Sequence, residues 1–71
     1  MRSFVKALQQ SLSRSLGCEC DFKYRDGPVF RFNAVLDGRY RDIDVVPLGA
    51  GLARVDVSGQ AAIRINWRNP S

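Results

Sequence analysis

Two pairs of residues have the types and spacing that could support chemistry, the cysteines at positions 18 and 20 and the aspartates at positions 42 and 44. The sequence contains no histidine, so it excludes a histidine-dependent triad, a proton shuttle and an imidazole metal site. A structural zinc centre needs four Cys or His ligands, which two cysteines cannot provide within one chain. A cysteine nucleophile would need a positioned base and a lowered pKa.

Cys18 and Cys20 stand in a row of alternating residues that continues to Phe22, as in a strand with one buried face. Two cysteines at positions i and i+2 of a strand point the same way with too little slack for a comfortable disulfide. We therefore expect both to be reduced, partly buried thiols.

Asp42 and Asp44 share one face of a strand, a pattern that could hold a divalent cation. Further oxygen ligands are lacking, however, and Asp44 is expected to face Arg31 as a cross-strand ion pair. The glycines at positions 49, 51 and 59 match no phosphate-loop spacing. We therefore expect a protein that is not an enzyme, with no metal, no cofactor and no small-molecule substrate.

The elements that must position these residues begin with a helix over about residues 3–16. Its apolar residues fall on one side of a 3.6-residue spiral, with Ser3 as N-cap and Gly17 ending the last turn. That apolar side consists of Met1, Phe4, Val5, Leu8, Leu12 and Leu16. The polar side carries too few cations for a membrane-surface helix. We therefore expect the helix to pack on a sheet through its apolar side, and the protein to need no membrane.

From residue 18 the period changes to two, which predicts strands over about 18–25, 29–36, 39–46, 52–58 and 61–68. Asp37-Gly38 is suited to a two-residue type I′ turn. That turn sets Phe32 opposite Ile43, Phe30 opposite Val45, Arg31 opposite Asp44 and Val35 opposite Tyr40. A loop at 26–28 sets Phe22 opposite Phe32 and Tyr24 opposite Phe30. We expect Pro47 to end the third strand, and Ala61, Ile63, Ile65 and Trp67 to face inward on the fifth.

Together these elements predict one α+β domain over residues 1–71, an N-terminal amphipathic helix on an antiparallel meander of four to five strands. The hairpin register places Arg39 and Arg41 on the inner face, beside Arg14 and the carboxyl end of the helix. There they either cap the helix dipole or form a binding site, and the first interpretation is slightly favoured. Tyr40 is the one aromatic residue expected to face outward.

A helix about 10 Å wide cannot cover five flat strands, which span about 20 Å. Either the sheet curls around the helix, or the face near Ile65 and Trp67 meets another chain, which would make a homodimer or a stable complex with a different protein. Trp67 is accordingly either a contact residue or a cover for the end of the helix near Phe4.

The chain has 71 residues and a net charge of +4, and nine of its eleven cations are arginine. A single core of this size rarely supplies more than about 3 to 5 kcal/mol. The charge either reflects surface solubility or favours an anionic partner. No stretch has the continuous apolar character of a signal peptide or a membrane span, so we expect a cytoplasmic protein.

These observations favour a non-catalytic binding module that engages a protein partner, as an inhibitor or adaptor. Its size and architecture are similar to those of small phage and mobile-element proteins that block a larger host machine, an analogy supported by no motif. The alternative is a nucleic-acid-binding protein with an arginine-rich sheet surface. The candidate binding residues are Arg31, Arg39, Tyr40, Arg41, Arg54, Arg64, Trp67 and Arg68.

Overall fold

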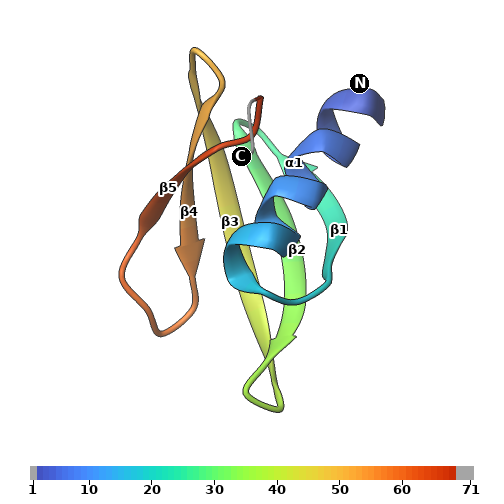
Figure 1. The fold of residues 1–71 in the computed structure, drawn as a ribbon, viewed down its shortest axis with the longest axis vertical. Coiled ribbons are helices and arrows are strands. Elements are labelled where there is room, and N and C mark those ends of the chain that lie inside the picture. The colour runs from blue at the N-terminus through green and yellow to red at the C-terminus, as the bar shows by residue number, and fades with distance from the viewer. Residues whose placement is uncertain (1, 69–71) are drawn as a thin grey trace.

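A single helix packs on one face of a five-stranded antiparallel sheet (Figure 1), so the predicted α+β class is confirmed. The computed structural model describes residues 2–68, and for residues 2 and 3 it describes the backbone alone. The elements are α1 (Arg2–Leu16), β1 (Cys20–Asp26), β2 (Val29–Leu36), β3 (Arg39–Gly49), β4 (Leu52–Val57) and β5 (Ile63–Asn66). The sheet follows chain order, as in a meander. Because α1 begins at Arg2, Ser3 lies in its first turn, and the capping role expected of its side chain falls outside the described part.

The sheet curls around α1. The helix contacts both edge strands, β1 and β5. In a flat sheet these strands would lie about 19 Å apart, too far for one helix to contact both. Leu8 and Leu12 of α1 are fully buried, and they fill the concave side above Phe32, Ile43 and Val55. Of the two arrangements that the sequence left open, the structure shows the curled sheet. Within residues 2–68, no helix is long and apolar enough to cross a membrane.

The β2–β3 hairpin has the predicted register. Phe32 pairs with Ile43, Arg31 with Asp44 and, nearer the turn, Val35 with Tyr40. Asp37 and Gly38 both have positive φ, at 54° and 76°, as the type I′ turn requires. Two residues of the right chemistry therefore align the longest pair of strands in the protein.

A β-bulge in β1 overturns the expected facing of its second half. Phe22 pairs with Phe32 as predicted, but the register then shifts, so that Tyr24 pairs with Arg31 and Arg25 with Phe30. The extra residue reverses the alternation beyond it. Tyr24 therefore lies on the outer face, and the Arg25 guanidinium lies 5.2 Å from the centre of the inward Phe30 ring. The expectation that Tyr24 faces inward is wrong.

Three strand boundaries also differ from the prediction. Cys18 lies in the turn after α1, and β1 begins only at Cys20, which removes the strand geometry that argued against a disulfide. β3 continues through Pro47 to Gly49. Because β2 begins only at Val29, this last part of β3 has no neighbouring strand on the β2 side. Proline, which has no amide hydrogen to donate, is tolerated at such an unpaired edge. β5 has four residues, and Ala61, expected to face inward, is an exposed residue before it.

Gly51 is the glycine whose replacement should cost most, because its conformation and its surroundings both exclude a side chain. Its φ is +79°, and an added Cβ would lie 2.7 Å from Arg68 Cβ. We expect Gly51→Ala to destabilise the protein by about 2 to 3 kcal/mol in urea unfolding. Gly27→Ala is the matched control, because Gly27 has φ +60° but open space around it. Equal losses in the two variants would show that the contact with Arg68 is unimportant.

Candidate protein-binding surface

The structure divides the predicted binding residues into three groups. Arg39 and Tyr40 lie at the β2–β3 turn. Arg31, Arg54 and Arg64 lie on the outer face of the sheet, which α1 does not cover. The remaining three, on the side of the sheet that carries α1 or at its margin, are Arg41, Trp67 and Arg68.

The first group forms, with Val35, what we call the tip surface, defined as Val35, Arg39 and Tyr40. Val35 and Tyr40 are cross-strand partners, and their exposed fractions are 50% and 81%. Figure 1 shows the turn of this hairpin projecting beyond the end of α1. Within residues 2–68, Arg39 makes no hydrogen bond or ion pair. The tip surface thus has the exposed side chains of Val35 and Tyr40 on one face of the hairpin, and an unpaired cation, Arg39, on the opposite face, where its cross-strand partner is Leu36.

Arg31, by contrast, is held in place by its neighbours. Its Nη1 lies 3.0 Å from Asp44 Oδ1 and its Nη2 lies 3.7 Å from Asp26 Oδ2. Its guanidinium carbon lies 5.9 Å from the centre of the Tyr24 ring. These contacts join β1, β2 and β3 across the outer face. The Arg31–Asp44 pair was predicted from the hairpin register, and its geometry is that of an architectural ion pair.

The outer face as a whole is not basic. Lys23 Nζ lies 3.5 Å from Asp42, and Arg54 Nε lies 3.4 Å from Asp56. The carboxylates that register and ion pairs place on this face are at least as numerous as its cations. The cations are Lys23, Arg31, Arg54 and Arg64, and the carboxylates are Asp21, Asp26, Asp42, Asp44 and Asp56. The net positive charge of the chain is therefore not concentrated on the open side of the sheet.

Arg41 and Trp67 have structural contacts on the other side of the sheet. Arg41 Nη1 donates a hydrogen bond of 3.2 Å to the carbonyl of Ser58, in the turn after β4. The sequence suggested the carbonyl end of α1 as the partner of this arginine, whereas in the structure Arg41 contacts the turn after β4. The Trp67 ring packs edge-on against Phe4 of α1, with ring centres 4.6 Å apart, and the Arg68 guanidinium lies over it. Trp67 therefore covers the first turns of the helix.

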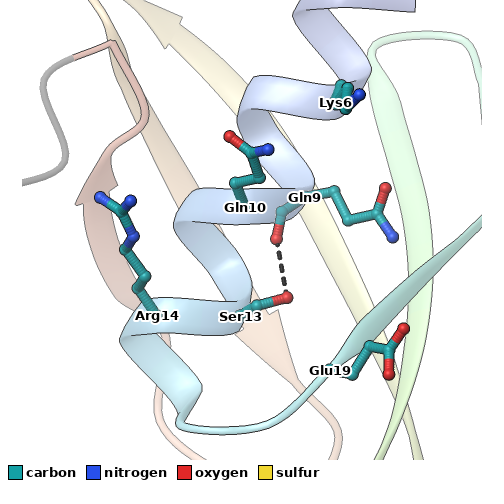
Figure 2. Close-up of a pocket in the computed structure, with 6 residues that line it drawn as sticks. All are labelled: Lys6, Gln9, Gln10, Ser13, Arg14 and Glu19. Carbon is teal, nitrogen blue, oxygen red and sulfur yellow. Dashed lines mark hydrogen bonds between the residues drawn. The ribbon is translucent and has the colours of Figure 1, made fainter.

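A polar groove runs beside α1, and its side chains do not converge on a common point (Figure 2). It is lined by Lys6, Gln9, Gln10, Ser13, Arg14 and Glu19. Figure 2 shows Arg14 and Glu19 on opposite sides of the helix. Gln9 and Ser13 attach α1 to the start of β1: Gln9 Nε2 donates to the carbonyl of Cys20 at 2.7 Å, and Ser13 Oγ accepts from the amide of Cys20 at 3.2 Å. The groove is a seam between helix and sheet.

Ser13→Ala should therefore destabilise the fold. It removes the acceptor for the Cys20 amide and leaves that amide beside a fully buried side chain without its partner. We expect a loss of about 1 to 2 kcal/mol in the free energy of unfolding, measured with urea. The matched control is Ser15→Ala, because Ser15 is an exposed serine on the same helix and should change stability by less than about 0.5 kcal/mol. A Ser13 variant as stable as the Ser15 variant would contradict this assignment.

The cysteine pair lies against the core rather than in a cleft. Cys20 is fully buried and Cys18 is half-buried, and both are free thiols. Burial raises the pKa of the Cys20 thiol from 9.0 to about 11, and the neighbouring Cys18 adds to the effect. At neutral pH this sulfur is protonated and is a poor nucleophile. Within residues 2–68, no group of three or more His, Cys, Asp or Glu side chains is placed to hold a metal ion.

Two surface residues were missed or misplaced by the sequence-based reasoning. Val35 was assigned to the outer row but not recognised as a binding residue, although its pairing with Tyr40 followed from the turn. Because of the bulge, Tyr24 faces outward as well, so that the outer face has a second aromatic residue in addition to Tyr40. No local signal in the sequence marks that bulge. Comparisons of the chain with protein-family models, with curated proteins and with solved structures gave no match.

Proposed function

We propose that this protein is a non-catalytic binding module that engages another protein through its tip surface, acting as an inhibitor or adaptor. The observation that carries the proposal is the exposure of Tyr40 and Val35 side by side at the end of a projecting hairpin. Tyrosine and arginine are the residue types that most often dominate the binding energy of protein interfaces. Apolar side chains that are exposed next to each other, as Val35 and Tyr40 are, can mark a contact surface, whereas single exposed apolar residues do not.

The hairpin suits this role because it is already ordered. A two-residue turn and the ladder between β2 and β3 fix the backbone on both sides of Tyr40. Binding through such a segment avoids most of the entropy that ordering a loop costs. The ion pairs of Arg31 and Lys23 lie further along the same sheet, where they hold the strands that carry the tip surface.

Nucleic-acid binding is the second candidate, and the placement of Tyr24 favours it, because an outward aromatic residue could stack on a base. The carboxylates on the outer face oppose it, since they repel phosphates. Binding of duplex DNA across a salt series separates the two candidates. A fall in log K of about 0.9 per tenfold rise in salt for each phosphate contacted would favour nucleic acid. The protein-binding proposal predicts no measurable binding at low salt.

The proposal is tested by comparing variants as baits in extracts of the native host. Tyr40→Ala and Val35→Ser should each lose a partner that the unchanged protein retains. Leu48→Ser is the matched control, because Leu48 has an exposed fraction of 49% and lies at the other end of β3. Each bait is first shown to be folded by circular dichroism. Equal recovery of the same partner by all four baits would contradict the assignment of the tip surface.

A further inference from the structure

Two arginines face each other at the β4–β5 margin of the outer face. Arg54 of β4 is the direct cross-strand partner of Arg64 of β5. Together with Ala62 and Ile63 they line a shallow depression at this edge of the sheet. Like charges placed directly opposite each other in an antiparallel pair are destabilising. The fold therefore holds two cations together without an evident structural benefit.

The hydrogen-bonding groups of this arginine pair are largely unused. Arg54 uses its Nε toward Asp56 Oδ2, at 3.4 Å. In the described part of the chain, the terminal nitrogens of Arg54 and all three guanidinium nitrogens of Arg64 lack a hydrogen bond or ion pair. A guanidinium presents its terminal N–H groups in a planar fork that matches the oxygens of a carboxylate or a phosphate. Two such forks from neighbouring strands can act on one oxyanion.

We propose that Arg54 and Arg64 form a binding site for a single oxyanion group, a carboxylate or a phosphate monoester. The bound anion would relieve the repulsion between the two guanidinium groups and accept hydrogen bonds from both.

The surroundings limit the ligand to a compact group. Val46 is the partner of Arg54 on β3, and Leu52 precedes Arg54 by two residues on the same face. Asp56 lies two residues beyond Arg54, opposite Asp44. A chain of phosphates that continued from the arginine pair along β4 would meet these carboxylates. One oxyanion fits the electrostatics of this edge, and an extended polyanion does not.

The site is independent of the proposed function. Val46 follows Tyr40 by six residues on β3, which places the arginine pair about 20 Å along the strand from the tip surface. Loss of one surface therefore leaves the other in place, and the two proposals can fail separately.

The test is an anion titration followed by NMR of the arginine side-chain N–H groups, with inorganic phosphate and acetate as probes and sodium chloride at matched ionic strength as the reference. We expect phosphate to shift the Nε–Hε signals of both Arg54 and Arg64. Arg64→Gln should weaken phosphate binding about tenfold, as expected when one of two charge-assisted partners is removed. Arg39→Gln, which removes an exposed arginine at the tip surface, should leave it unchanged. Arg54→Gln gives a second, independent variant of the site.

A second readout follows from the repulsion between the two arginines. At low salt without oxyanion, Arg64→Gln should melt at the same temperature as the unchanged protein or higher. Added phosphate should raise the melting temperature of the unchanged protein more than that of the variant. Acetate acting like phosphate would assign a carboxylate as a competent ligand, and phosphate acting alone would assign the monoester. Signal shifts that chloride reproduces, or equal phosphate binding by Arg64→Gln and the unchanged protein, would overturn the proposal.

Discussion

Phe32→Ala is expected to leave the protein largely unfolded at room temperature. Phe32 is 0% exposed, lies opposite Ile43 and packs edge-on against the ring of Phe22, with ring centres 5.3 Å apart. Removing a buried phenylalanine side chain costs about 3 to 5 kcal/mol, because the protein loses the free energy of burying that apolar surface and is left with a cavity. The core of a domain this small rarely supplies more than about 3 to 5 kcal/mol in total. Far-ultraviolet circular dichroism and urea unfolding measure the loss.

Two further substitutions make this expectation specific. Phe22→Ala should cost less, because Phe22 is 37% exposed on an edge strand. Phe32→Leu keeps most of the buried volume and should retain a cooperative unfolding transition. If Phe32→Ala unfolded at the same urea concentration as the unchanged protein, the arrangement of the core described above would be wrong.

The second large effect is a loss of stability at alkaline pH. Burial raises the pKa of the Cys20 thiol to about 11, whereas 9.0 is its ordinary value and applies to the unfolded chain. Between these values the folded state retains a proton that the unfolded state releases, so the free energy of unfolding falls as pH rises. The contribution of Cys20 is complete below pH 9 and is lost by about pH 11, and a shift of this size corresponds to about 2 to 3 kcal/mol.

Cys20→Ala isolates this contribution, because it removes the Cys20 thiol and keeps every other ionisable side chain of the chain. The difference in urea unfolding free energy between the unchanged protein and Cys20→Ala should therefore shrink from pH 8 to pH 11. A difference that stays constant over this range would show that the Cys20 thiol is not held in its protonated form by the fold.

The β2–β3 hairpin could be predicted in detail because its information is local. Asp37-Gly38 specifies one turn type, and that turn aligns Phe32 with Ile43 and Arg31 with Asp44. The alternation of apolar residues then places the outer and inner rows. For the same reason the pairing of Val35 with Tyr40, on which the tip surface depends, was readable from the sequence.

The features that sequence reasoning missed depend on contacts between distant parts of the chain. The bulge that turns Tyr24 outward leaves no mark in an alternating segment, since Phe22 and Tyr24 fit an unbroken row equally well. The hydrogen bonds of Gln9 and Ser13 to Cys20 arise from the way α1 lies along β1. Pro47 stays in β3 because β2 does not extend beside it, and the sequence around the proline does not reveal where β2 begins.

Among the arginines, too, contacts set by local sequence could be predicted, and contacts between distant segments could not. The partner of Arg31 followed from the register of one hairpin, whereas the opposition of Arg54 and Arg64 depends on the register of β4 and β5, whose loop length the sequence left open. Arg41 contacts Ser58, which is 17 residues away in the chain, and this explains why helix capping was favoured without the structure.

The central claim is that Tyr40 at the hairpin tip contacts another protein, and site-specific photo-crosslinking in the native host tests it most directly. A photoreactive phenylalanine analogue replaces Tyr40 in one variant and Gln60, an exposed residue in the turn after β4, in the control. We expect one dominant crosslinked protein from position 40 and none of it from position 60. The same crosslink from both positions, no protein crosslink from position 40, or a crosslink to nucleic acid in its place would contradict the account.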